Sequence, residues 1–189
     1  MGQDNQITGQ GTSAAAAAPA LDRKALETRI LNAGTPGQCR AELYKIFDVQ
    51  PDEVALLRLE KGLLRFLFPS ELNAAGSIPI SSSSAIAAHT AVTKKVDLFN
   101  NFTIVKHASI FESVKPGAAS SEEMRPATIQ KLMSAPVLDK ADRVLGVVQI
   151  CHKGFDLASA GPDFTLDDLQ KLELVAKALA HLGFLREQR

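Results

Sequence analysis

The stretch of residues 144–151 constrains the fold of this 189-residue chain more than any other segment. Valine, leucine and isoleucine nearly fill it, which predicts a central β-strand that is buried on both faces. Because side chains alternate along a strand, Gln149 and Cys151 are expected on one face, and Val148 and Ile150 on the other. Both faces of the sheet therefore need a covering layer.

Other short apolar runs supply partners for this strand. Residues 132–138 precede it across a polar turn, and residues 54–59 and 63–68 flank a turn of their own, so both pairs predict β-hairpins. Arg58 and Arg65 interrupt the earlier pair, as expected if one face of that hairpin is partly wet.

Helical segments surround the strands. Residues 22–33 and 164–186 predict the first and last helices, the latter capped by Thr165. Thr35 is expected to cap a further helix in a capping box with Gln38. The helices and hairpins together give an α+β class around an antiparallel sheet.

The composition of the chain limits its domain boundaries, its partners and its location. Residues 1–20, rich in glycine and alanine, predict a disordered tail, which leaves residues 21–189 as a single domain. Lysine plus arginine and aspartate plus glutamate both total 21, and this balance argues against nucleic acid as a partner. No apolar run reaches the roughly 18 residues of a membrane helix, and the N-terminus lacks the pattern of a secretory signal. We therefore expect a cytoplasmic protein that does not bind membranes.

Two cysteines lie far apart, so neither a disulfide framework nor a cysteine zinc site is expected, and no metal ligands are assigned. Cys39 falls on the apolar face of its helix and is expected to be a core residue. No phosphate-binding loop, nucleophile-elbow serine or His-Glu-X-X-His motif occurs. The sequence therefore predicts no enzymatic activity.

The second hairpin and the last helix resemble the second half of a GAF domain. The residues that carry the resemblance are Ala135-Pro136-Val137, Gly146-Val147-Val148-Gln149-Ile150, Lys153, Phe164 and Asp168. The resemblance extends more loosely over residues 35–185 and implies a six-stranded antiparallel sheet with helices on both sides. It also implies a structural salt bridge between Lys153 and Asp168. His152 stands where the cyclic-nucleotide branch of the family has asparagine, which argues against that ligand.

Members of this family typically bind a small molecule beside the sheet. The resemblance therefore implies ligand-binding residues ahead of and along a helix that is expected at residues 85–93. A run of serines before the helix offers hydroxyl groups and backbone N–H groups to a phosphate or carboxylate. The candidate ligand-binding residues are Ser81, Ser82, Ser83, Ser84, His89, Thr90 and His107. The alternatives are that one serine only caps the helix, that His89 is exposed, and that His107 is a pocket residue or a haem ligand.

The last helix carries a second apolar row, formed by Leu174, Ala178, His181 and Leu185. This row can pack on the first helix and then on a second subunit, which predicts a homodimer through the terminal helices. The alternative is that the first helix alone covers the row.

The leading hypothesis is a stand-alone, small-molecule-sensing regulatory domain. Its ligand is unknown, and a nucleotide or another small anion is expected. Its expected partner is a signalling protein that responds to ligand binding. Ligand binding is expected to reorder residues 94–128 and to shift the terminal helices. The alternative is a ligand-free structural module for dimerisation or protein interaction. A third hypothesis is a small redox enzyme that uses Cys151.

Overall fold

The computed structural model describes residues 22–102 and 127–186. Within them, six strands form one antiparallel sheet in the order β3-β2-β1-β6-β5-β4. The strands are β1 (Val54–Glu60), β2 (Leu63–Phe68), β3 (Ile78–Pro79), β4 (Asp97–Phe99), β5 (Thr128–Leu138) and β6 (Val144–Gly154). The predicted tail at 1–20 lies outside the described residues. The α+β class and the six-stranded antiparallel sheet expected from the sequence are confirmed.

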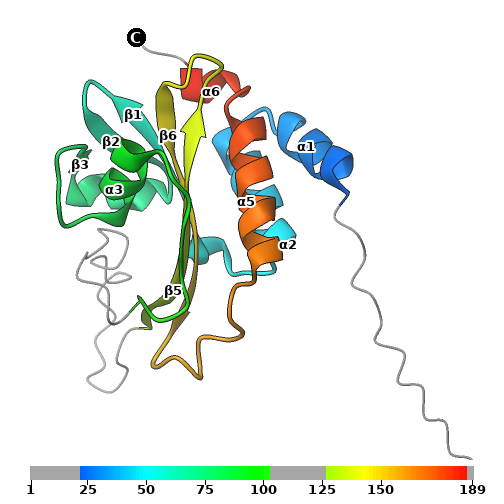
Figure 1. Cartoon of the computed structure of the whole chain (residues 1–189), viewed down its shortest axis with the longest axis vertical. Helices are drawn as coiled ribbons and strands as arrows, with labels where there is room; N and C mark the ends of the chain where they lie inside the picture. Colours follow the sequence, from blue (N-terminus) through cyan, green and yellow to red (C-terminus); the bar gives the residue numbers. More distant parts are fainter. Residues whose placement is uncertain (1–21, 103–126, 187–189) are drawn as a thin grey trace, which may run out of the picture.

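Helices cover both faces of the sheet (Figure 1). One face carries α1 (Arg23–Leu31), α2 (Pro36–Phe47), α5 (Leu166–Leu179) and the short α6 (Gly183–Arg186), and the opposite face carries α3 (Ile86–Thr93). Two 3₁₀ helices, η1 (Pro51–Glu53) and η2 (Ser70–Ala75), complete the description. The terminal helices α1 and α5 pack together, as expected. No helix in the described ranges is long and apolar enough to span a bilayer.

The last helix differs from the prediction. A single helix over residues 164–186 was expected, but α5 ends at Leu179 and α6 begins at Gly183. Between them the backbone turns, with the His181 amide bonded to the Ala178 carbonyl. Arg186 Nε donates to the Ala180 carbonyl at 2.7 Å, which gives the end of α5 a hydrogen-bond partner in place of a continued helix.

The first helices begin where the sequence places them. Thr35 is the N-cap of α2, and its hydroxyl accepts a hydrogen bond from the Gln38 amide at 3.3 Å. Cys39 is fully buried on this helix, and burial raises the pKa of its thiol to about 12. The prediction that Cys39 is a core residue is therefore confirmed.

The β1–β2 hairpin turns at Lys61 and Gly62, whose φ angles of 48° and 79° are both left-handed. Such angles suit the two-residue turns that match the twist of a hairpin. Arg58 and Arg65 are cross-strand partners, and both form ion pairs with Glu60. This charged group explains how two arginines are accommodated in an otherwise apolar hairpin.

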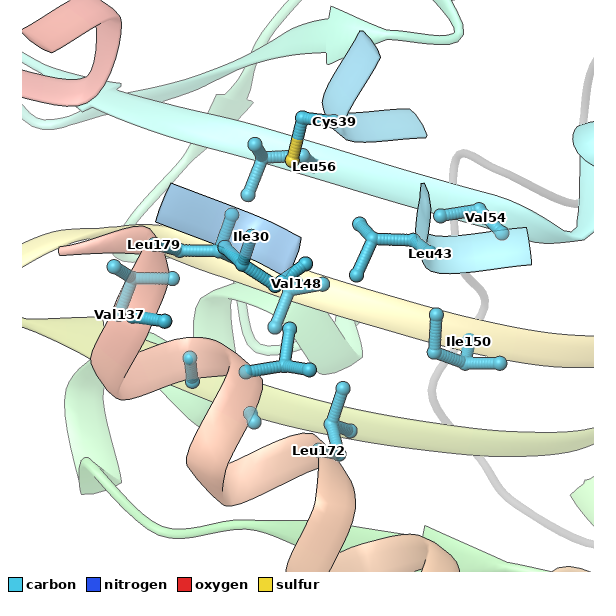
Figure 2. Close-up of a cluster of buried hydrophobic side chains, with 14 of the residues drawn as sticks. Ile30, Cys39, Leu43, Val54, Leu56, Val137, Val148, Ile150, Leu172 and Leu179 are labelled. Carbon is cyan, nitrogen blue, oxygen red and sulfur yellow. The ribbon is translucent and has the colours of Figure 1, made fainter. Parts of the chain in front are cut away.

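Strand β6 lies in the middle of the sheet between β1 and β5, and its side chains divide as predicted. Val148 and Ile150 join a core with α1, α2 and α5, which we call the α5-side core (Figure 2). Cys151 joins a second core with α3, which we call the α3-side core. The two cores lie on opposite faces of one sheet.

Candidate functional site

Four polar side chains form a hydrogen-bonded chain between α3 and the sheet, and we call them the polar network. The hydroxyls of Thr90 on α3 and Ser134 on β5 are 2.8 Å apart, and Thr90 Oγ1 also donates to Asp97 Oδ2 on β4 at 3.2 Å. Gln149 on β6 donates from Nε2 to Ser134 Oγ at 3.3 Å. Thr90, Ser134 and Gln149 are at most 1% exposed. Buried polar groups need partners, and here the network provides them.

The surroundings of the polar network are apolar. On α3, Ala87, Ala88 and Ala91 are buried against the sheet, and Leu132 and Val147 belong to the same core. Hydrogen bonds are stronger in such a medium, and an unpaired polar group there is costly. The α3 side therefore combines an apolar wall with a few polar groups, which is the composition typical of small-molecule sites.

Asp97 supplies the charge of the network. It is half-buried on β4, at the edge of the sheet. A carboxylate accepts hydrogen bonds but donates none when ionised. This end of the network therefore favours a hydrogen-bond donor on any group that approaches it.

The predicted serine run lies at the start of α3 but caps nothing. Ala85 is the N-cap of α3, with no side-chain hydrogen bond to the helix, so the alternative that one of the serines caps this helix is wrong. The two hydroxyls of Ser82 and Ser84 lie 3.2 Å apart. Of the four residues, Ser82 is half-buried, whereas Ser81, Ser83 and Ser84 are exposed.

The other predicted ligand residues have different positions. Thr90 faces the sheet and belongs to the polar network. His89, its neighbour on α3, is exposed, in agreement with the alternative weighed for it. His107 lies outside the described residues.

The expected salt bridge between Lys153 and Asp168 is replaced by two other ion pairs. Lys153 Nζ lies 2.9 Å from Asp52 Oδ2 and donates to the Asp52 carbonyl at 2.7 Å. Asp168 instead pairs with Lys171 at 2.8 Å, one turn along α5, and accepts from the Thr165 amide at 2.9 Å. Although partial burial raises the pKa of Asp168, hydrogen bonds from Lys171 and Thr165 bring it below its usual value. Asp168 therefore caps its own helix, and Lys153 holds β6 to η1.

Phe164, the third residue of that motif, is held on two sides. Its ring stacks on His152 with the centroids 4.3 Å apart and the planes 8° from parallel. Its backbone is bound by Asn100, whose Oδ1 accepts from the Phe164 amide at 2.9 Å and whose Nδ2 donates to the Phe164 carbonyl at 3.0 Å. Thr165, the N-cap of α5, follows directly, so these contacts fix where α5 begins.

Partial burial lowers the pKa of His152 below the ordinary histidine value. The negative charge of Glu53 acts in the opposite direction, and the positive charge of Lys131 adds to the lowering. Lys131 is itself 4% exposed and donates to the Gly161 carbonyl at 2.6 Å. The neutral imidazole is thus the form that this environment favours.

The cysteines offer no redox pair. Cys39 belongs to the α5-side core and Cys151 to the α3-side core, so the two fully buried side chains lie on opposite faces of the sheet. In the described ranges, no group of three or more histidine, cysteine or acidic side chains is arranged to hold a metal ion.

Two open grooves lie away from the polar network. One, of about 470 Å³, runs between α5, the end of β5 and Lys94, which forms a 2.6 Å ion pair with Asp142. The other, of about 510 Å³, lies beside the β5–β6 turn and includes His181 and Arg186. No network residue lines either groove.

Sequence reasoning named Thr90 but missed Asp97, Ser134 and Gln149 as site residues. A usable signal exists for two of them. Ser134 and Gln149 are polar residues within strands that are otherwise apolar, and a buried strand keeps such residues only where each finds a partner. Asp97 carries no comparable signal, because it follows a lysine-rich loop in a weakly patterned segment.

Comparison with known families gives one match, to the model described as GAF domain, over residues 39–181. This span covers most of the chain, which therefore belongs to the GAF domain family. Such domains are typically sensory or regulatory. The comparison with curated proteins gives no match.

Solved structures with the same fold come from proteins of different roles. The GAF domain from an Acinetobacter phosphoenolpyruvate-protein phosphotransferase is 11% identical, with a TM-score of 0.60, over 87% of this chain and 90% of that one. Residues 122 to 287 of a methyl-accepting chemotaxis protein are 14% identical, with a TM-score of 0.55 and coverages of 82% and 92%. The reduced form of fRMsr of Staphylococcus aureus is 15% identical, with a TM-score of 0.53 and coverages of 84% and 93%. At such identities the likeness concerns the fold, which does not by itself assign a function.

Proposed function

We propose that this chain is a small-molecule-sensing regulatory domain whose ligand binds on the α3 side of the sheet. The observation that carries the proposal is the polar network, which places three almost fully buried polar side chains in an apolar layer. The α5-side core covers the opposite face of the same strands with apolar residues. A purely structural layer can be built without such groups, so their presence supports a binding role.

The chemistry of the network indicates what the ligand carries. Hydroxyl and amide groups both donate and accept, and Asp97 accepts. A ligand with an amine, amide or ring N–H group can donate to Asp97 and exchange hydrogen bonds with Thr90 and Gln149. The serines ahead of α3 would receive an anionic part of the same molecule, so nucleotides combine both features.

The test is a thermal-shift screen of the purified chain. The panel holds nucleotides, cyclic mono- and dinucleotides, amino acids, keto acids, haem and bilins. A ligand at 100 times its dissociation constant stabilises a fold by about 2.7 kcal/mol, which raises Tm by roughly 5 to 10 °C for a domain of this size. A donor-bearing compound is expected to give such a shift.

A flat panel combined with a dimer in sedimentation would favour the alternative, a ligand-free module for dimerisation. The described residues already bury part of the second apolar row of α5: Ala178 and Leu185 lie in the α5-side core, and Leu174 packs against it. His181 at the end of that row is exposed. Most of this row is therefore covered within one chain. A homodimer through the terminal helices is kept as the second proposal and is measured by sedimentation of the wild type.

A further inference from the structure

Strand β4 connects two features of the described chain that lie on opposite sides of the sheet. Asp97, its first residue, accepts a hydrogen bond from Thr90 in the polar network. Asn100, which directly follows β4, binds both the amide and the carbonyl of Phe164 ahead of α5. A short stretch of backbone therefore joins the α3 side to the start of α5.

Strand β4 is also, with β3, one of the two short edge strands of the described sheet. It is three residues long, it lies at the edge of the sheet, and it pairs with β5 alone, through Asp97–Ser134, Leu98–Met133 and Phe99–Leu132. All three of its residues are only half-buried. The central strand β6, in contrast, is paired on both sides from Gly146 to Ile150.

We propose that β4 couples the polar network to the N-terminus of α5, with Asn100 as the positioning residue. A change in the hydrogen bonds of Thr90 shifts Asp97, the shift passes along β4, and Asn100 carries it to Phe164 and the capped first turn of α5. This inference rests on the proposed function for its biological meaning. The mechanical coupling itself can be measured without any ligand.

The chain contains a matched control for Asn100. Asn73 makes the same pair of contacts elsewhere: its Oδ1 accepts from the Phe66 amide at 3.1 Å, and its Nδ2 donates to the Phe66 carbonyl at 2.8 Å. Asn100→Ala and Asn73→Ala therefore remove equivalent hydrogen bonds, but only the first lies between β4 and α5. A general loss of stability would appear in both variants.

The experiment is amide hydrogen exchange of the full chain in a double-mutant cycle. Thr90→Val removes the hydroxyl that links Asp97 to Ser134 while preserving the shape of the side chain. It is expected to speed the exchange of the Phe164, Asp168 and Leu169 amides roughly two- to tenfold, the factor that corresponds to one lost hydrogen bond. Amides of α2 serve as the internal reference.

The double-mutant cycle then distinguishes coupling through Asn100 from a general loss of stability. In the Asn100→Ala background, Thr90→Val should no longer affect these amides, whereas in the Asn73→Ala background its effect should persist. Unchanged exchange at the start of α5 in Thr90→Val, or an equal effect in both backgrounds, would overturn the proposal. If Thr90→Val does not fold, Asp97→Ala interrupts the same path from the polar network to α5 at a half-buried position. Its effect on the same amides is then measured in both backgrounds. If no compound in the thermal-shift screen raises Tm but the exchange cycle shows the expected coupling, only the proposed function is contradicted.

Discussion

The two faces of the sheet are built from the same strands but contain different chemistry. On the α5 side, the strand residues Met133, Ala135, Val148 and Ile150 pack in an apolar core against three helices. On the α3 side, the same strands place Ser134 and Gln149 among apolar neighbours, where they meet Thr90 of a single alanine-rich helix. The α5 side also holds a buried charge, Lys131, which bonds to the Gly161 carbonyl and Asp163 near the start of β5. The α3 side differs in that its buried polar side chains bond to one another, across α3 and two strands.

The largest effect is expected from truncating the α5-side core. Ile150 is fully buried in the central strand, so Ile150→Ala removes packing and leaves a cavity. The free energy of unfolding should fall by about 2–5 kcal/mol, measured by urea denaturation. Leu166→Ala is the control, because Leu166 is 74% exposed and its loss should change the stability by less than about 0.5 kcal/mol. A loss below about 1 kcal/mol for Ile150→Ala would show that this face is not the main source of stability.

A close backbone contact in the sheet should give the next largest effect. A Cβ at Gly146 would overlap the Leu57 carbonyl oxygen on β1, so Gly146→Ala forces the two strands apart. We expect a loss of about 1–3 kcal/mol in the same denaturation experiment. Gly37→Ala provides the comparison, since nothing lies within 4 Å of the Cβ built there. Equal stability of the Gly146 and Gly37 variants would contradict the strand spacing described here.

On the α3 side, a single change in the polar network is expected to cost about as much as the Gly146 substitution. Thr90→Val leaves Ser134 and Asp97 without their shared partner, which should lower the free energy of unfolding by about 1–3 kcal/mol. Thr93→Val removes an exposed hydroxyl that bonds to the His89 carbonyl, and should have almost no effect. Equal stability of Thr90→Val and Thr93→Val would show that the buried hydrogen bonds of Thr90 do not contribute to stability.

The sequence predicts those parts of the molecule that depend on neighbouring residues. The cap of α2 at Thr35, the hairpin turn at Lys61 and Gly62, and the two faces of β6 all follow from short patterns. The fold class follows from their order and from the family motifs.

The parts that were missed depend on contacts between residues far apart in the chain. Thr90 and Ser134 are separated by 44 positions, and Asn100 and Phe164 by 64. Lys153 was expected to pair with Asp168 but pairs with Asp52, which is 101 positions away. A pattern read along the chain cannot choose among carboxylates that only the folded sheet brings near one lysine.

The smallest expected effect is a pH dependence of stability at the start of α5. Because burial lowers the pKa of His152, the unfolded chain binds a proton first as the pH falls through the ordinary histidine range. The contribution of His152 is therefore fully present above about pH 6.5, and it is lost as the pH falls toward the lower folded pKa.

Urea midpoints of the wild type and His152→Gln at pH 7.5 and 5.5 would measure this effect. The wild type should lose more stability than the variant between these two values. His89→Gln, which changes an exposed histidine, should behave like the wild type. The same pH dependence in wild type and His152→Gln would assign the effect to other groups.

The central claim is that the polar network serves binding rather than folding, and one double variant tests it most directly. Thr90→Val combined with Ser134→Ala removes both partners of the buried 2.8 Å hydrogen bond, although Gln149 and Asp97 then lose the hydrogen bonds that these hydroxyls made with them. Replacing both partners by apolar groups can be nearly neutral. The account predicts that the double variant loses less free energy of unfolding than the sum of the two single changes, together with loss of the thermal shift expected for the wild type with a donor-bearing ligand. A double variant that is destabilised by the sum of the single changes, or that keeps the full ligand shift, would contradict the account.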